Sequence, residues 1–523
     1  MSNPSLTLLK HIFFRPSLRR SSKTLVAVAV SISLLISNFG SQPATAQANQ
    51  YCQLSSKATE EKENLRLLAL KGNKDAENRY QSLLQQHSKE LEECRNRNWP
   101  KTQAIWLRLY PCDREKGEVA KIMDHIVNKG YNEVYLEAFY DGQVLLPTAN
   151  NPTVWPSVVR TPGAEKVDLL AMGIEEGRKR GLKVYAWMFT VNFGYTYGRR
   201  ADREQAIARN GKGQTSLYVV DDGSQVFVDP YNTQARTDIY RLVQEILRRR
   251  PDGVLFDYVR YPRQAGTDSI STKVKDLWLY SPATQEAFLR RGENLKGTEL
   301  MRRFLLRGYI TAGDINEVDK LYPQEDEPMW QGRIIPPPVE ENVAQENSVE
   351  QKSVQQKPKL TAAQRQPTLQ FELWQLAVAH AMQGILDFVA LASYPAQQQG
   401  IPTGVVFFPE GNKVIGKGYD SRLQPWDRFP STQEWHPMSY ATCSSADCIA
   451  TQVQSVLNAA KPDTKVIPAL AGLWGKPISN RPPLEDQMQA LRQFAPQINA
   501  VSHFAYSWQH PENDRDRKSC NIR

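Results

Sequence analysis

The stretch "DGVLFDYVRYPR", residues 252–263, decides how the rest of the chain is interpreted. Residues 253–256 form an apolar run with the length of a short buried strand. Asp257 follows this run directly, and Tyr258 and Arg260 come close behind it. A carboxylate at the end of a buried strand is costly unless it is paired or used. The stretch therefore predicts a strand that ends in either a structural ion pair or a functional group.

Similar β-rich runs recur along residues 101–510. They lie at 104–111, 133–140, 182–190, 253–261, 403–409, 434–441, 465–474 and 500–508. Helical patterns separate most of them, at 118–130, 168–181, 233–250, 373–393, 448–459 and 484–494. Repeated strand–helix units imply a parallel sheet, and eight of them predict a (β/α)8 TIM barrel. A doubly wound open sheet is the alternative, but "YPCDREKGE" after the first strand is not the Gly-rich phosphate turn that such sheets usually carry.

Other segments flank or interrupt the barrel pattern. Residues 263–370 are predicted to be a long insertion after the fourth strand, with a helical part at 281–322. Within it, residues 334–367 are rich in Gln, Pro, Glu and Lys, which predicts a disordered or extended linker. Residues 52–99 have a helical period with a central break, which predicts a helical hairpin before the barrel. Residues 511–523 are predicted to form a C-terminal tail.

The first 46 residues have the three parts of a secretory signal peptide. They contain five basic residues and no acidic one, then the apolar run "TLVAVAVSISLLIS", then small residues that allow cleavage after Ala46 or Ala48. An uncleaved anchor is the alternative, although the run is short of the roughly 20 residues that span a bilayer. We therefore expect an exported protein, periplasmic or extracellular, with no membrane span after cleavage.

Most of the basic charge belongs to this leader. The formal net charge is +9, and the residues after the leader carry only +4 of it. They show no stripe of Lys and Arg with interleaved aromatic residues, so no nucleic-acid partner is predicted.

Six cysteines would enter an oxidising compartment after export. Cys52 with Cys94 would close the helical hairpin, and Cys443 with Cys448 would close a loop after the sixth strand. Cys112 with Cys520 would join the first and eighth strands, which are neighbours in a closed barrel. The cysteine and histidine spacings do not suggest zinc, and no cofactor is predicted.

The candidate site follows from where a barrel places its chemistry, at the carboxyl ends of the strands. Because side chains alternate along a strand, Asp257 and Glu137 are predicted to point inward. Glycoside hydrolysis needs two carboxyl groups, about 5–5.5 Å apart for retention or about 6.5–9.5 Å for inversion. Asp257 is the predicted catalytic carboxylate, with Glu137 or Glu410 as its partner. The predicted substrate-binding residues are Arg108, Trp187, Asp229, Tyr258, Arg260, Tyr440 and Trp508.

Five motifs give the chain a family resemblance: "AIWLRLY", "NEVYLEAFYDGQVLLPT", "RGLKVYAWM", "FVDPYN" and, above all, "DGVLFDYVRYP". With them the chain resembles the glycosyl-hydrolase-like 10 family. The resemblance implies a TIM barrel in secreted bacterial proteins, some of which cleave peptidoglycan strands stripped of their peptides. It supports Asp257, Tyr258 and Arg260 as site residues. The chain departs from the family by having Glu137 where Gln is frequent and by keeping Trp374 without the arginines that usually follow it.

The leading functional prediction is a secreted glycoside hydrolase that acts on cell-wall or related amino-sugar glycans. A non-catalytic barrel that binds glycan strands and organises the wall is the main alternative. An exported carbohydrate deacetylase is a weaker one, because it needs a metal and the sequence offers no His/Asp cluster for it.

Overall fold

The computed structural model describes residues 51–219, 223–335, 360–440 and 443–520, all of which belong to one compact unit. The predicted signal peptide lies outside the described residues. Disulfide bonds join the three pairs of cysteines predicted from the sequence, namely Cys52–Cys94, Cys112–Cys520 and Cys443–Cys448.

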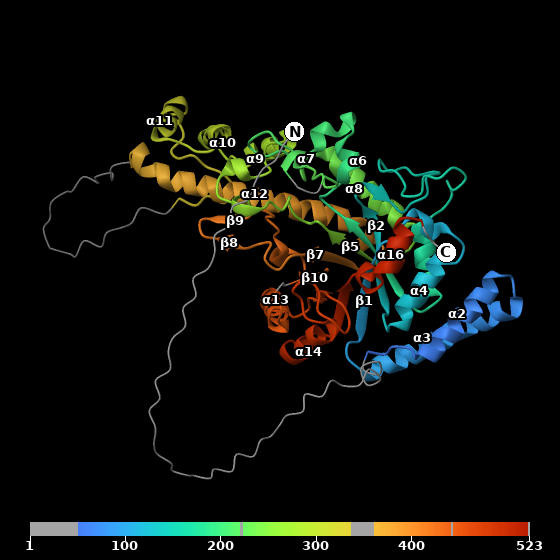
Figure 1. The fold of residues 1–523 in the computed structure, drawn as a ribbon. Helices are drawn as coiled ribbons and strands as arrows, with labels where there is room; N and C mark the ends of the chain where they lie inside the picture. Colours follow the sequence, from blue (N-terminus) through green and yellow to red (C-terminus); the bar gives the residue numbers. More distant parts are fainter. Residues whose placement is uncertain (1–50, 220–222, 336–359, 441–442, 521–523) are drawn as a thin grey trace, which may run out of the picture. The chain divides into compact units, whose positions relative to one another are not determined.

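Eight parallel strands form a closed barrel (Figure 1). They are β1 (Thr102–Leu107), β2 (Glu133–Tyr140), β4 (Lys183–Phe189), β5 (Gly253–Asp257), β7 (Thr403–Phe407), β10 (Glu434–Ser439), β11 (Ala469–Ala471) and β12 (Ala500–Phe504). The ring closes because β1 pairs in parallel with both β2 and β12. The short strand β3 (Gln143–Val144) adds an antiparallel pair to β2. The predicted (β/α)8 TIM barrel is confirmed.

Amphipathic helices cover the outside of the barrel. They are α4 (Glu118–Asn128), α5 (Leu169–Arg178), α8 (Thr233–Leu247), α12 (Ala362–Gln398), α13 (Ala446–Ala459) and α14 (Leu484–Phe494). Between β7 and β10 the chain forms the strands β8 (Val414–Ile415) and β9 (Gly418–Asp420), which pair with each other, and the 3-10 turn η5 (Trp426–Arg428). After β12 come α15 (Tyr506–Gln509) and α16 (Pro511–Lys518).

The insertion after β5 carries several further helices. It contains β6 (Ile270–Ser271), α9 (Pro282–Leu289), α10 (Leu295–Arg307) and α11 (Ala312–Leu321), and α10 and α11 lie beside the first turns of α12 (Figure 1). The loop between β4 and β5 holds the short helices α6 (Gly194–Gly198) and α7 (Ser216–Val219). These additions enlarge the rim at the carboxyl ends of the central strands.

Helix α12 begins inside the segment that was predicted to be an extended linker. Thr361 and Gln364 form a capping box, so residues 362–367 are the first turns of a helix, and residues 336–359 lie outside the described part of the chain. In the described ranges α12 is the one helix long and apolar enough to cross a membrane. In its most apolar window, however, 67% of the residues are buried inside the structure.

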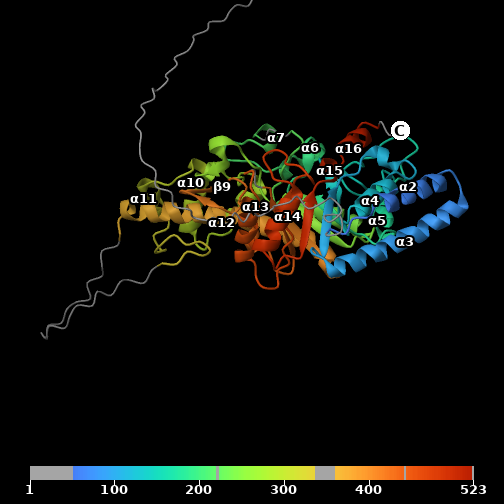
Figure 2. The same cartoon turned by 60° about the horizontal axis from the view of Figure 1, so that its bottom comes forward.

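The hairpin of α2 (Ser56–Leu70) and α3 (Lys74–Arg97) packs beside α4 and α5 (Figure 2). Its attachment is polar and buried. The Tyr80 hydroxyl donates to Asp124 Oδ2 at 2.6 Å, and Arg180 donates to both Asp124 Oδ1 at 2.8 Å and the Tyr80 oxygen at 2.6 Å. Because this network joins α3 to α4 and to the residues before β4, it fixes the hairpin to the barrel wall.

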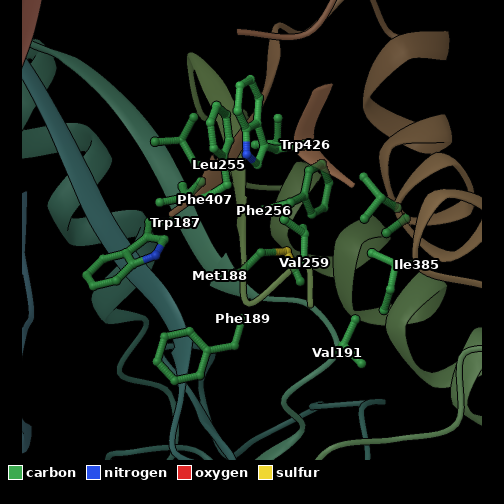
Figure 3. Close-up of a cluster of buried hydrophobic side chains, with 14 of the residues drawn as sticks. Trp187, Met188, Phe189, Val191, Leu255, Phe256, Val259, Ile385, Phe407 and Trp426 are labelled. Atoms are coloured by element: carbon green, nitrogen blue, oxygen red, sulfur yellow. The ribbon is translucent and has the colours of Figure 1, made fainter. Parts of the chain in front are cut away.

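Strands β4 and β5 show the alternation that positions the site. Phe256 and Met188 point toward α12 and its Ile385, while Trp187 and Phe189 point to the opposite side (Figure 3). Phe189 pairs in register with Asp257. Asp257 thus lies on the inner side of the barrel with the two aromatic residues.

Gly253, in the motif that opens β5, is required by close packing. A Cβ atom there would lie 2.1 Å from the ring of the buried Tyr185. We expect Gly253→Ala to destabilise the protein by about 1–3 kcal/mol, the usual effect of overpacking a core. Urea unfolding would measure this. Gly223→Ala is the matched control, because nothing lies within 4 Å of its added Cβ. Equal stability of the two variants would contradict the packing argument.

Candidate active site

A pocket of about 180 Å³ opens at the carboxyl ends of the barrel strands. Every barrel strand except β11 contributes a lining residue, from the strand itself or from the position just after it. The lining residues are Trp106, Arg108, Glu137, Trp187, Phe189, Asp257, Tyr258, Arg260, Val406, Phe408, Met438, Tyr440 and Phe504. The pocket therefore combines two carboxylates and two guanidinium groups with an aromatic wall.

Asp257 is the last residue of β5 and is only 7% exposed. Its Oδ2 accepts a hydrogen bond from Trp187 Nε1 at 3.1 Å, and its Oδ1 accepts one from the backbone N–H of Tyr258 at 2.6 Å. Burial raises the pKa of Asp257 to about 6, although both hydrogen bonds and Arg260 oppose this shift. The pKa of Asp257 is therefore closer to neutral pH than that of an exposed aspartate.

The backbone turns sharply directly after Asp257. Tyr258 has a φ of +52°, a conformation that costs a non-glycine residue about 1–3 kcal/mol. The turn places the Tyr258 ring against Phe189, with their centroids 4.3 Å apart. Strain of this kind clusters at functional sites, because the surrounding structure must hold it in place.

Glu137 is 1% exposed and lies beside an irregularity in β2, where the pairing with β4 shifts between Glu137 and Phe139. Both of its oxygens accept hydrogen bonds from Arg108, whose Nη2 is 3.0 Å from Oε1. Arg108 also reaches Asp141 Oδ2 at 3.3 Å. Burial raises the pKa of Glu137 to about 7, and Arg108 keeps that rise smaller than burial alone would make it.

Aromatic rings form the floor and wall of the pocket. Trp106 meets Trp187 edge to face at 4.8 Å, and Tyr440 lies 5.5 Å from Phe504. Burial raises the pKa of Tyr440 well above its ordinary value, and the charge of Asp257 adds to this effect. Aromatic faces beside carboxyl groups suit a ligand with apolar faces and polar edges, such as a sugar ring.

Seven of the predicted site residues meet in this pocket, namely Arg108, Glu137, Trp187, Asp257, Tyr258, Arg260 and Tyr440. The structure places the other three elsewhere. Glu410 lies in the loop after β7 and accepts from Gln452 Nε2 at 2.5 Å. Asp229 is fully buried and accepts from the backbone of Tyr231 and from Thr284. Trp508 sits on α15, with the Arg481 guanidinium 5.7 Å from its ring.

Six lining residues were not predicted from the sequence: Trp106, Phe189, Val406, Phe408, Met438 and Phe504. Strand alternation could have found two of them. Trp106 shares its side of β1 with Arg108, and Phe189 shares its side of β4 with Trp187.

Part of the chain is similar to known proteins. The family model described as "Glycosyl hydrolase-like 10" matches residues 98–294. The glycosyl hydrolase DigH of Escherichia coli strain K12 is 26% identical over 153 residues, which cover 28% of this chain. DigH of Shigella flexneri gives the same values. The aligned part spans 34% of these curated relatives, about a third of their length.

Solved glycosidase structures also resemble the chain. A GH18 chitinase from Pseudoalteromonas aurantia has 9% identity and a TM-score of 0.34, and the match covers 80% of this chain and 98% of that one. A GH20 exo-β-N-acetylglucosaminidase from Vibrio harveyi, in complex with N-acetylglucosamine, has 10% identity and a TM-score of 0.37, with coverages of 80% and 52%.

The family match includes β1, β2, β4 and β5, and with them both pocket carboxylates. The resemblance inferred from the sequence motifs is thus confirmed, and residues 98–294 of this chain match the glycosyl hydrolase-like 10 family.

Proposed function

We propose that this protein is a glycoside hydrolase that cleaves cell-wall or related amino-sugar glycans, including peptidoglycan strands free of peptides. One observation carries the proposal: two buried carboxyl groups, Asp257 and Glu137, line one aromatic pocket at the carboxyl face of the barrel. Two carboxyl groups in different environments are what acid–base cleavage of a glycosidic bond requires.

The environments of the two groups suggest their roles. Asp257 has the lower pKa and accepts two hydrogen bonds, so it acts as the ionised group, either as nucleophile or as base. Glu137 has the higher pKa and acts as the proton donor to the leaving oxygen. Arg108 already contacts Asp141, so a guanidinium shifted toward Asp141 on substrate binding would free Glu137 for this role.

The size of the pocket limits what can occupy it. Ligand pockets for larger molecules measure about 300–1,000 Å³, so a pocket of about 180 Å³ holds one sugar ring. We therefore propose that the rest of a glycan strand lies outside the pocket, along the rim formed by the barrel loops.

The activity should depend on pH as a bell-shaped curve. Cleavage requires Asp257 without its proton and Glu137 with one, so kcat/KM should fall below about pH 6 and again above about pH 7. Because the charges of the two groups interact, these limits belong to the pair and not to either residue alone. Rates measured from pH 4 to 9 would check this. A rate that stays level from pH 5 to 8 would contradict the assignment.

Digestion of purified peptidoglycan and of peptide-free glycan strands tests the proposed reaction. Mass spectrometry of the products should show cleaved glycan strands, with the peptide-free strands cut faster. Unchanged strands in both samples would exclude this reaction for these substrates.

A second candidate function is a glycan-binding barrel without catalysis. The bidentate hold of Arg108 on Glu137 favours it, because a carboxylate held at both oxygens is a poor proton donor. Strand binding without any product, in both the parent and Asp257→Asn, would support this function over hydrolysis.

An oxidising compartment is also part of the proposal. Three disulfide bonds suit an exported protein, since such bonds persist mainly outside the cytosol. We place the protein in the periplasm or outside the cell, where cell-wall glycans are found.

A further inference from the structure

The Arg260 guanidinium in the pocket has little to balance its charge. Arg260 is 6% exposed and lines the pocket beside Asp257. Of its five N–H donors, one is used within the described part of the chain, in a hydrogen bond from Nη1 to the Tyr261 carbonyl at 2.9 Å. It forms no ion pair with a carboxylate of the described residues. The remaining donors are therefore available to a ligand.

The other fully buried arginines in the described part of the chain differ in this respect. Arg180 is paired with Asp124, Arg422 with Asp420, and Arg517 with Asp113. A buried charge without a partner is costly, and proteins normally avoid it by pairing. An arginine left unpaired inside a pocket is thus unusual in this structure and needs an explanation.

Aromatic rings compensate Arg260 only in part. Its guanidinium carbon lies 4.7 Å from the ring of Tyr258, 5.6 Å from Phe227 and 5.7 Å from Phe408. Such contacts hold a guanidinium in place and leave its edge free for hydrogen bonds. Arg422 and Arg263 add positive charge nearby, which works with burial to lower the pKa of Arg260. The surroundings therefore favour the arrival of an anion.

Asp257, the neighbouring acid, does not accept a hydrogen bond from Arg260. Asp257 is close enough for its charge to act on Arg260, but its oxygens accept from Trp187 and from the backbone of Tyr258. A planar guanidinium with free donors matches a carboxylate, which it can bind through two parallel hydrogen bonds.

We propose that Arg260 binds a carboxylate carried by the sugar in the pocket, so that the substrate is an acidic glycan. This inference rests on the proposed function and narrows its substrate class. Two kinds of sugar present the required group next to a glycosidic bond. One is a uronic acid, and the other is an amino sugar with a lactyl ether whose carboxylate is free of peptide.

The first test compares paired substrates with the unmodified protein. Peptide-free peptidoglycan strands have free lactyl carboxylates, and treatment with carbodiimide and ammonia converts these to neutral amides. We expect kcat/KM to be about 10–100-fold higher on the acidic strands, the range for a charge-assisted pair in a buried site. Hyaluronan oligosaccharides test the uronic-acid source in the same assay. Equal rates on acidic and amidated strands, with no cleavage of hyaluronan, would overturn the inference.

Variants test whether Arg260 causes the preference for acidic over amidated strands. Arg260→Gln should remove the 10–100-fold preference by slowing only the acidic substrate, and Arg260→Lys should retain part of it, because lysine keeps the charge and loses the planar fork. Arg263→Gln is the matched control: it makes the same change of charge at an exposed position three residues away. An equal loss on both substrates in Arg260→Gln, or the same loss of preference in Arg263→Gln, would contradict the assignment.

Titration calorimetry separates this inference from the proposed reaction. If no strand is cleaved but the acidic strands bind more tightly than the amidated ones, and Arg260→Gln removes the difference, carboxylate recognition stands and hydrolysis fails. If strands are cleaved without regard to their charge, hydrolysis stands and carboxylate recognition fails. Failure to bind either acidic probe overturns the inference.

Discussion

Asp257→Asn should lower turnover by about 10²–10⁴-fold, the range for loss of a group that acts directly in proton transfer or bond cleavage. The fold should survive, because the asparagine side-chain oxygen can still accept the hydrogen bond that Trp187 Nε1 donates to Asp257. Circular dichroism and thermal unfolding would check the fold, and initial rates on peptide-free glycan strands would give the loss. Near-normal turnover in this variant would overturn the assignment of the site.

Glu410→Gln is the matched control for that experiment. It makes the same change of charge at the other carboxylate that was considered as a partner, which accepts from Gln452 and lies outside the pocket. We expect its turnover to stay within about twofold of the parent, as for a surface substitution away from the site. A loss of turnover as large as that of Asp257→Asn would show that Glu410 takes part in the reaction.

Arg517→Met should destabilise the protein by about 3–5 kcal/mol, the cost of leaving one member of a buried ion pair alone. Arg517 and Asp113 have side chains 1% and 0% exposed, and they form two hydrogen bonds at 2.8 and 2.6 Å. Arg517 also donates to the Arg108 carbonyl at 2.8 Å. Its loss should therefore disturb the residue that holds Glu137 as well as the fold.

Urea unfolding of three variants would resolve this effect. Arg515→Met removes a charge from the same helix at a side chain that is 73% exposed, and it should change the stability by less than about 0.5 kcal/mol. Asp113→Asn combined with Arg517→Met should recover part of the loss, because no unpaired charge then stays buried. An Arg517→Met variant as stable as Arg515→Met would show that the pair contributes nothing.

The barrel could be predicted because each strand is an apolar run and each helix has its own period. Each of the eight predicted runs overlaps a strand of the barrel, and the differences lie at their ends. The last run was extended to residue 508, but β12 ends at Phe504 and the chain enters α15. Trp508 therefore belongs to a helix. Hydrophobic pattern alone does not separate the end of a buried strand from a short buried helix.

The candidate site was predictable where strand alternation fixed the direction of a side chain. This holds for Asp257 and Glu137, which are both buried and line the pocket. Asp229 could not be judged in this way, since its partner Thr284 lies 55 residues later in the chain. The hold of Arg108 on both oxygens of Glu137 is seen only in the structure, because a sequence shows which groups can meet but not how many hydrogen bonds each receives.

The insertion after β5 also bears on how such a barrel can diversify. The chain leaves the barrel directly after Arg260 and Tyr261, and it rejoins the helical layer at α12. The strands β1 and β12, whose pairing closes the ring, lie in distant parts of the sequence, so the ring does not depend on the length of this segment. A library of loop variants can therefore change the segment that follows Arg260 while the barrel strands that hold Asp257 and Glu137 are kept.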